Sequence, residues 1–407
     1  MCDRFIIRGK RLVTVSELGT IEDGAMVIED HLIRDIGPWA SLKQKYLELP
    51  VVDYSDMVIT PSLVDCHTHL LEFAPSSLYP VTQETHFQAA QSILFTALSS
   101  GITALGEQIC GHPLCDFSLE DYKISSSDFP IDISFATTSI SIGFEDLAHF
   151  SSVTKSQKLK KKDLVDPLVV KNLAMESEYP GENIFINATP ANFSVTEVPR
   201  AGEIIYSLQE LQQIVSIYHE VNKEIGAHVA GEEGIALALE AEIDVLHHSH
   251  GITDIQLQKV AQQKTKIVAT PMGGTHIKPN SPEEILKMMQ LNIPVSIATD
   301  AYLPPYPNVP WLHFTDQHLK GPETLMLVAK PAMELLHQNG YNDNQCLALI
   351  TNNPSNILGK GNLFGRLEHG LQANFLVATG LPGLEITDPE QIKHVYFHGQ
   401  KVIERKS

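Results

Sequence analysis

Apolar and polar residues alternate in short runs at both ends of the chain, with turn-forming residues between the runs. Such runs are typical of short β-strands; they occupy residues 5–15, 25–37, 51–61, 374–380 and 394–403. Because the same pattern opens and closes the chain, we predict that the two ends build one small domain of β-sandwich type. Its expected bounds are residues 1–58 plus 360–407.

The pattern between the two ends is different, because apolar runs there alternate with stretches of helical periodicity. Eight runs are expected to be strands, at residues 64–66, 103–106, 131–137, 183–188, 224–229, 244–247, 266–270 and 295–299. Helices are expected at residues 83–99, 207–221, 234–242 and 282–290, and helix is expected to dominate residues 321–358. This order predicts an α/β fold, a (β/α)₈ TIM-like barrel over residues 59–359.

Composition narrows the classes of partner. The chain of 407 residues has 49 acidic and 29 basic side chains, a balance that argues against nucleic acid, which selects basic surfaces. No stretch approaches the roughly 20 apolar residues that span a bilayer, so we expect no membrane partner. The first residues lack the regions of a secretion signal. We therefore expect a cytoplasmic protein that acts on a small molecule.

The cysteines do not describe a disulfide framework. The chain has five, an odd number scattered over its length: Cys2, Cys66, Cys110, Cys115 and Cys346. Reduced thiols are the expected state. Cys110 and Cys115 are close enough to bind a metal together, but no second pair accompanies them.

The first chemical signal is the segment LVDCHTHL. His67 and His69 are two positions apart at the end of a strand-like run, so both imidazoles point to the same side of the backbone. Such a pair can chelate one metal ion. At the carboxyl end of a barrel strand, it would face the loops that form the active sites of this fold.

Further ligand-type residues end later strands. His228 ends one expected strand, the group His247, His248 and His250 ends the next, and Asp300 follows the last. Strand ends of a barrel gather over one mouth, where ligands distant in sequence can reach one ion. Taken singly, each histidine could equally be a hydrogen-bonded core residue.

The chain resembles the amidohydrolase superfamily from end to end. The resemblance rests on ITPSLVDCHTHL, GITAL, HVAGEEGIALALEAEIDVLHH, ATDA and the closing NPSNILGKGNLFGRLEHGLQANFLVA, and is nearest to its imidazolonepropionase, enamidase and dipeptidase-like branches. It implies one or two divalent ions, with zinc favoured, on His67, His69, His228, His248 and Asp300. His248 is preferred because it stands four residues after Asp244; His247 and His250 stay open.

One departure from the family bears on the number of metal ions. Many two-metal relatives carry a bridging carboxylated lysine at the end of strand four, where this chain offers Asn187, and Lys171 falls in an expected helix. Either the site holds one metal, or a carboxylate substitutes for the lysine. Glu107 is the candidate for this role, and its alternative is a position on the surface or behind the ligands.

The resemblance implies a hydrolase that cleaves a carbon–nitrogen bond of an amide, cyclic amide or dipeptide. Asp300 would act as general base and then as general acid. The alternative is an amino-heterocycle deaminase, whose HxxE motif would need a glutamate where Gly231 stands; Glu232 is one position later. A non-catalytic binding protein on this fold is a third reading. His276 is the expected substrate contact, and the family allows a homo-oligomer.

Overall fold

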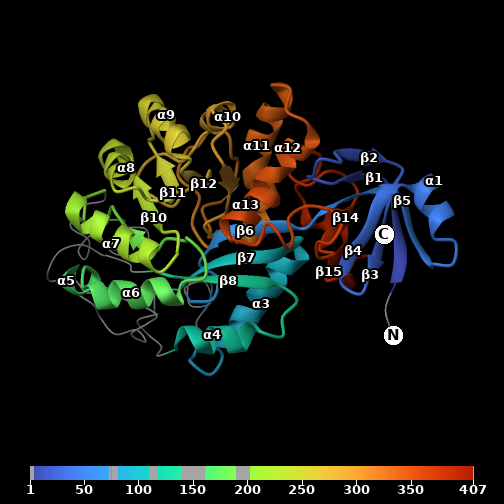
Figure 1. The fold of residues 1–407 in the computed structure, drawn as a ribbon, viewed down its shortest axis with the longest axis horizontal. Helices are drawn as coiled ribbons and strands as arrows, with labels where there is room; N and C mark the ends of the chain where they lie inside the picture. Colours follow the sequence, from blue (N-terminus) through green and yellow to red (C-terminus); the bar gives the residue numbers. More distant parts are fainter. Residues whose placement is uncertain are drawn as a thin grey trace.

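The computed structural model describes residues 4–72, 75, 81–109, 117–138, 161–188, 202–314 and 316–406. A parallel barrel-like body and a separate mixed β-sheet lie side by side (Figure 1). The sheet carries both ends of the chain.

The terminal segments form one eight-stranded sheet, as the sequence predicted. Its order is β16-β15-β14-β5-β1-β3-β4, with β2 paired to β1. The strands are β1 (Arg4–Val13), β2 (Thr20–Glu22), β3 (Gly24–Glu29), β4 (Leu32–Pro38), β5 (Val51–Pro61), β14 (Phe375–Ala378), β15 (Ile392–Phe397) and β16 (Gln400–Glu404). The two ends of the chain join where β5 pairs with β14 in antiparallel fashion.

The terminal sheet curls, which gives it a sandwich-like interior. The Ala373 amide donates to the His31 carbonyl in the β3–β4 turn, and the Gly399 amide in the β15–β16 turn donates to the Ala373 carbonyl. Ala373 therefore links the two turns. Apolar side chains from strands near both ends of the sheet, including Ile33 of β4 and Tyr396 of β15, pack in one cluster. Helix α1 (Trp39–Lys45) covers a second, smaller cluster with Leu42.

All eight predicted barrel strands are present. They are β6 (Leu63–Thr68), β7 (Ile102–Ile109), β8 (Asp132–Thr137), β9 (Ile184–Phe185), β10 (Gly226–Ala230), β11 (Val245–His250), β12 (Lys266–Ala269) and β13 (Val295–Ile297). They pair in parallel and in chain order, as β6-β7-β8 and as β9-β10-β11-β12-β13. Beyond β13, the amide of His69 donates to the Ala301 carbonyl at 2.7 Å, which joins the first strand to the last.

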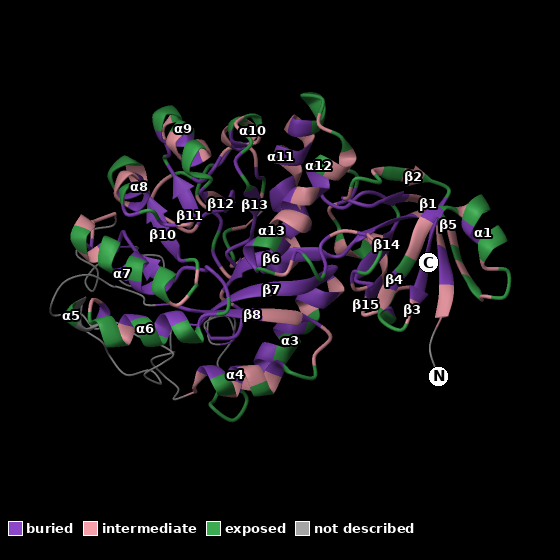
Figure 2. Ribbon diagram, in the orientation of Figure 1, coloured by how far each residue is buried: buried purple, intermediate pink, exposed green. Residues whose placement is uncertain are grey.

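Helices connect the barrel strands, and three more, α11 to α13, follow the last barrel strand. They are α3 (His86–Ser99), α4 (Leu119–Ser126), α5 (Lys161–Leu164), α6 (Pro167–Glu176), α7 (Leu208–Glu220), α8 (Gly231–Glu240), α9 (Asp254–Gln263), α10 (Pro282–Gln290), α11 (Leu325–Gln338), α12 (Asp343–Leu347) and α13 (Asn352–Ile357). Their inner faces are buried and their outer faces exposed (Figure 2). Capping boxes begin α7, α9 and α10, where Ser207, Thr253 and Ser281 bond the first turn.

Polar contacts tie the terminal sheet to the barrel helices. Arg11 of β1 reaches Asp343 of α12 at 3.3 Å and Glu385 at 2.6 Å. The Asn344 side chain accepts a hydrogen bond from the amide of Val15 at 2.7 Å. Among the residues described, no helix is long and apolar enough to cross a membrane.

Candidate metal centre

The structure brings all five predicted ligands together at the carboxyl ends of the barrel strands. The Nε2 atom of His67 lies 3.2 Å from Oδ1 of Asp300, and that of His69 lies 3.6 Å from the same oxygen. His67 is in β6, His69 directly follows it, and Asp300 follows β13. His228 of β10 and His248 of β11 complete the group, with ring centroids 4.5 Å apart.

A sixth residue, Glu182, lies at the centre of these ligands and was missed by the sequence analysis. Its Oε2 atom is 3.5 Å from Nε2 of His67 and 3.3 Å from Nε2 of His69. Its Oε1 atom is 2.6 Å from Nδ1 of His228 and 2.7 Å from Nε2 of His248. Each carboxylate oxygen therefore faces a different pair of histidines.

Glu182 takes the central place that the sequence analysis considered for Glu107. The segment before β9 is inserted deeply: the Glu182 amide donates to Oε1 of Gln108 at 2.8 Å, and its carbonyl accepts from the Thr138 hydroxyl. A Cβ on Gly226 would lie 1.9 Å from the carbonyl oxygen of Gly181, so this close approach requires glycine. Tyr-Pro-Gly-Glu-Asn reads as a solvent-exposed turn in sequence, which hid this position.

The other strand-four candidates have structural places. Asn187 accepts from the Ala230 amide at 2.9 Å and donates to the Gly202 carbonyl at 3.1 Å. Lys171 lies on the exposed face of α6, as expected.

The three histidines of HHSH have different surroundings. His248 faces the ligand group, and its other nitrogen, Nδ1, bonds the Thr270 hydroxyl at 2.7 Å. His247 bonds Nδ1 of His67 instead, and His250 bonds the hydroxyls of Thr270 and Thr275. The geometry thus favours His248, the residue preferred from its spacing.

Left-handed backbone at the strand ends helps to aim two of the ligands. His248 has φ of 67° and Asp300 has φ of 54°, conformations that non-glycine residues seldom adopt and that gather at functional sites. Gly274, with φ of 114°, lies against both of them, and a Cβ there would come within 2.3 Å of Oδ2 of Asp300. The loop after β12 must therefore carry glycine at this point.

The electrostatics of the group are strongly coupled. Burial alone would raise the pKa of Glu182, but the charges of His67 and His228 hold it well below its ordinary value. Burial would lower the pKa of His67, whereas Glu182 and Asp300 raise it to about 10. For His248, burial and then the charge of His228 lower the pKa well below the ordinary value.

The donor set suits a divalent cation. Ring nitrogens and carboxylate oxygens form three overlapping groups, His67–His248–Asp300, His67–His69–Glu182 and Glu182–His228–His248, each with all ligand atoms within 4.8 Å of one another. Among the described residues, the buried Nε2 atom of His67 has no hydrogen bond of normal geometry. Mixed nitrogen and oxygen donors of this kind are compatible with zinc, and also with iron, nickel, copper or manganese.

The comparison with known families decides the assignment of the chain. The sequence profile of the amidohydrolase family matches residues 58–402. The chain belongs to the amidohydrolase family. It is therefore a hydrolase of the kind that acts on carbon–nitrogen bonds, whose members use divalent metals.

Individual relatives agree with this membership. The chain is 24% identical over 319 residues to the imidazolonepropionase of Pyrobaculum arsenaticum, a match that covers 72% of this chain and 77% of the relative. Among solved structures, the A. niger ochratoxinase has a TM-score of 0.72 at 16% identity, over 99% of this chain and 96% of the other. A Xaa-Pro dipeptidase has a TM-score of 0.71 at 17% identity, over 98% and 100%. These likenesses support the fold of the chain.

Glu107 lies beside the amidohydrolase ligand group without joining it. It is fully buried, and it accepts hydrogen bonds from the Thr68 hydroxyl and the Leu71 amide, both at 2.7 Å. It therefore holds the Thr68 side chain before His69 and the Leu71 backbone after it. Burial raises its pKa to about 7, although hydrogen bonds from Leu71 and Thr68 oppose the shift.

His276 is near the ligand group, at its rim. It is half-buried beside Gly202, and its pKa is lowered by burial and by the charge of His228. The aromatic loop after β13 packs nearby on the segment after β12, since Trp311 donates to the Pro271 carbonyl and the Tyr306 amide to the Met272 carbonyl.

Two other sequence features have different outcomes. Cys66 and Cys346 are free and buried. Cys2, Cys110 and Cys115 lie outside the described residues, so the weaker two-cysteine hypothesis is untested.

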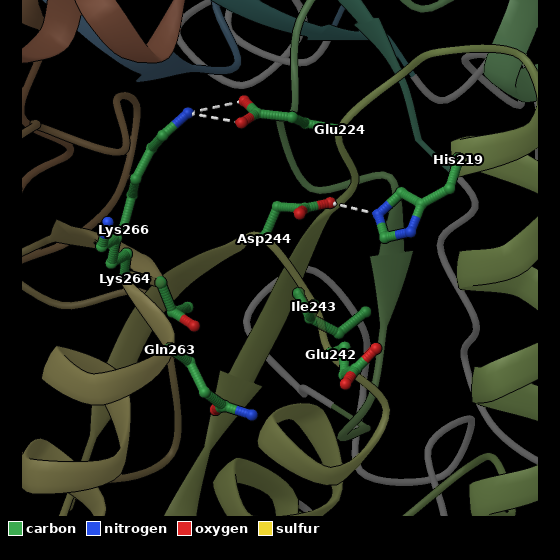
Figure 3. Close-up of a pocket in the computed structure, with 9 residues that line it drawn as sticks. His219, Glu224, Glu242, Ile243, Asp244, Gln263, Lys264 and Lys266 are labelled. Carbon is green, nitrogen blue, oxygen red and sulfur yellow. Dashed lines mark hydrogen bonds and ion pairs between the residues drawn. The ribbon is translucent and has the colours of Figure 1, made fainter.

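A polar pocket lies at the opposite, amino-terminal ends of β10, β11 and β12 (Figure 3). There His219 pairs with Asp244 at 2.9 Å, and Lys266 with Glu224 at 2.6 Å. The pocket is remote from the ligand group, because the ligands lie at the other ends of the same strands.

Proposed function

We propose that this amidohydrolase holds two divalent cations, zinc by preference, with Glu182 as the carboxylate between them. His67, His69 and Asp300 would hold one cation, and His228 and His248 the other. The observation that carries the proposal is that the two carboxylate oxygens of Glu182 face different histidine pairs. Its Oε2 faces His67 and His69, and its Oε1 faces His228 and His248. In this proposal Glu182 bridges the two cations, the role that a carboxylated lysine has in many two-metal relatives.

Such cations would polarise a substrate carbonyl and lower the pKa of water from 15.7 to about 7. We assign the proton transfer to Asp300, because it is buried against His67 and His69 and its Oδ2 lies close to Gly274, which has no side chain. It takes a proton from the attacking water and then returns it to the leaving nitrogen.

The substrate class we propose is a small amide, cyclic amide or dipeptide cleaved at a carbon–nitrogen bond. This follows family membership and the relatives named imidazolonepropionase and Xaa-Pro dipeptidase. His276 would contact the substrate, because it stands at the rim beside Gly202 within the electrostatic reach of His228.

Deamination is the second candidate, and the structure gives it less support. A deaminase of this superfamily needs a glutamate just after the strand-five histidine. Gly231 occupies that position, and Glu232 and Glu233 are both exposed on the first turn of α8. No carboxylate from this turn is buried beside His228.

The test is metal analysis joined to substrate assays. Wild-type protein, Glu182→Gln and the control Glu242→Gln, which changes the remote pocket, are loaded with zinc, dialysed and analysed for metal. We expect about two equivalents of zinc per chain in wild type and control, and at most one in Glu182→Gln. Cleavage of an amide or dipeptide is expected only in proteins that hold both cations. Ammonia release from amino-heterocycles would favour the deaminase, and absence of retained metal in wild type would contradict the proposal.

A further inference from the structure

His247 makes an unusual contact behind the ligand group. Its Nδ1 atom lies 2.7 Å from Nδ1 of His67, and its Nε2 atom lies 2.9 Å from the carbonyl oxygen of Pro180. Both rings are completely buried, and their centroids are 4.7 Å apart.

The Pro180 carbonyl determines which ring nitrogens of His247 and His67 carry hydrogen in these two hydrogen bonds. A carbonyl oxygen only accepts, so Nε2 of His247 donates to it. The two partners of His247 are a carbonyl and another imidazole, and neither is an anion that would stabilise a doubly protonated ring. Neutral His247 then has a lone pair on Nδ1, and His67 must donate to it from its own Nδ1.

The consequence reaches the ligand group. A divalent cation would bind only the neutral form of the His67 ring. In that form a hydrogen on Nδ1 leaves the lone pair on Nε2, the atom 3.2 Å from Asp300 Oδ1 and 3.5 Å from Glu182 Oε2. We propose that His247 is a positioning residue, which fixes the tautomer of His67 so that Nε2 is presented to a divalent cation. This inference rests on the proposed function and adds a residue to it.

The same short segment fixes two parts of the centre. Pro180 supplies the carbonyl that orients His247, and Glu182, two residues later, supplies the central carboxylate. Partners behind a metal-binding histidine commonly change affinity by about 10–100-fold when they are removed. Here the partner is an imidazole lone pair, which only the Nδ1–H form of His67 can use.

The first measurement is made on the unaltered protein. Zinc-loaded, ¹⁵N-histidine-labelled protein is examined by long-range ¹H–¹⁵N correlation, with His67→Asn identifying the His67 signals. The proposal expects hydrogen on Nδ1 of His67 and on Nε2 of His247. Hydrogen on Nδ1 of His247 in place of His67 would overturn it, whether or not any variant folds.

Two variants supply the affinity test. His247→Leu removes the acceptor, and His247→Asn restores an acceptor oxygen near the position of Nδ1. Zinc affinity, measured by chelator competition, should fall about 10–100-fold in His247→Leu and be largely recovered in His247→Asn, while the remote control His219→Gln matches wild type. Wild-type affinity in His247→Leu would overturn this inference alone; a wild type that holds no zinc would overturn the proposed function with it.

Discussion

Glu107 is a buried carboxyl group, and its raised pKa should make the stability of the metal-free protein depend on pH. Its pKa rises from 4.5 to about 7, because burial disfavours the charged form. Between these two pH values the folded chain keeps a proton that the unfolded chain releases. This group's contribution to the free energy of unfolding therefore falls as pH rises through that window, by about 3 kcal/mol in total.

The check is urea unfolding of metal-free protein at a series of pH values. Glu107→Gln cannot ionise, and its amide can still bond Thr68 and Leu71, so its stability should lack this loss between about pH 4.5 and 7. Glu242→Gln, in the exposed remote pocket, should keep the wild-type slope. Identical slopes in wild type and Glu107→Gln would show that Glu107 is not the titrating group.

Asp300 allows a direct test of the proposed proton transfer. Asp300→Asn keeps the size of the side chain but removes the base, so kcat should fall by about 10²–10⁴-fold on any substrate found. The exposed change Asp254→Asn should leave kcat unaltered. A loss of less than tenfold in Asp300→Asn would assign the base to another residue.

Single residues also show what the sequence could and could not supply. His67 and His69 were predictable because period-two spacing at a strand end has a direct geometric meaning. Glu182 was not, because its place depends on a turn-like segment inserted beside β10. The separate roles of His247 and His248 were equally hidden, since the left-handed backbone at His248 breaks the alternation expected of a strand.

At the scale of elements, the alternation of apolar runs and helical stretches was enough to predict all eight barrel strands. The boundaries were harder: β9 is only the two residues Ile184–Phe185 within the predicted 183–188. Among the described residues, no ladder pairs β9 with β8; side-chain bonds such as Asn183 to the Thr137 carbonyl link the two segments instead. The spacing of apolar residues carries no information about hydrogen bonds between a side chain of one segment and the backbone of another.

The insertion of residues 180–182 beside β10 makes Gly226 a sensitive position. In Gly226→Ala the new Cβ would meet the Gly181 carbonyl oxygen at 1.9 Å, so the segment that carries Glu182 must move. Overpacking of this kind costs about 1–3 kcal/mol, and zinc retention should fall below two equivalents. Calorimetry and metal analysis measure the two effects.

Gly37→Ala is the matched control for Gly226→Ala. A Cβ at Gly37 would meet nothing within 4 Å, and this variant should resemble wild type in both measurements. Full zinc retention in Gly226→Ala would show that Glu182 does not depend on this close approach.

At the scale of the whole molecule, the two ends of the chain share one sheet, as predicted, because β5 and β14 pair next to the first barrel strand. The division at residues 58 and 360 remains a prediction, as do the cytoplasmic location and a homo-oligomer. The sequence could indicate these features only through pattern and family resemblance, whereas the strand order follows from backbone pairing.

Metal binding should stabilise the barrel as a whole, because the proposed ligands come from strands around most of its circumference. The first and last strands meet at the ligands themselves, where the Asp300 amide donates to the His67 carbonyl at 3.1 Å. A cation that binds only the folded chain adds about 4 kcal/mol when its free concentration is 1,000 times its Kd. EDTA should therefore lower the Tm of zinc-loaded protein, and zinc should restore it. Glu182→Gln should show a smaller shift, whereas Glu242→Gln should match wild type; a Tm that is independent of both EDTA and zinc would contradict a cation held between these strands.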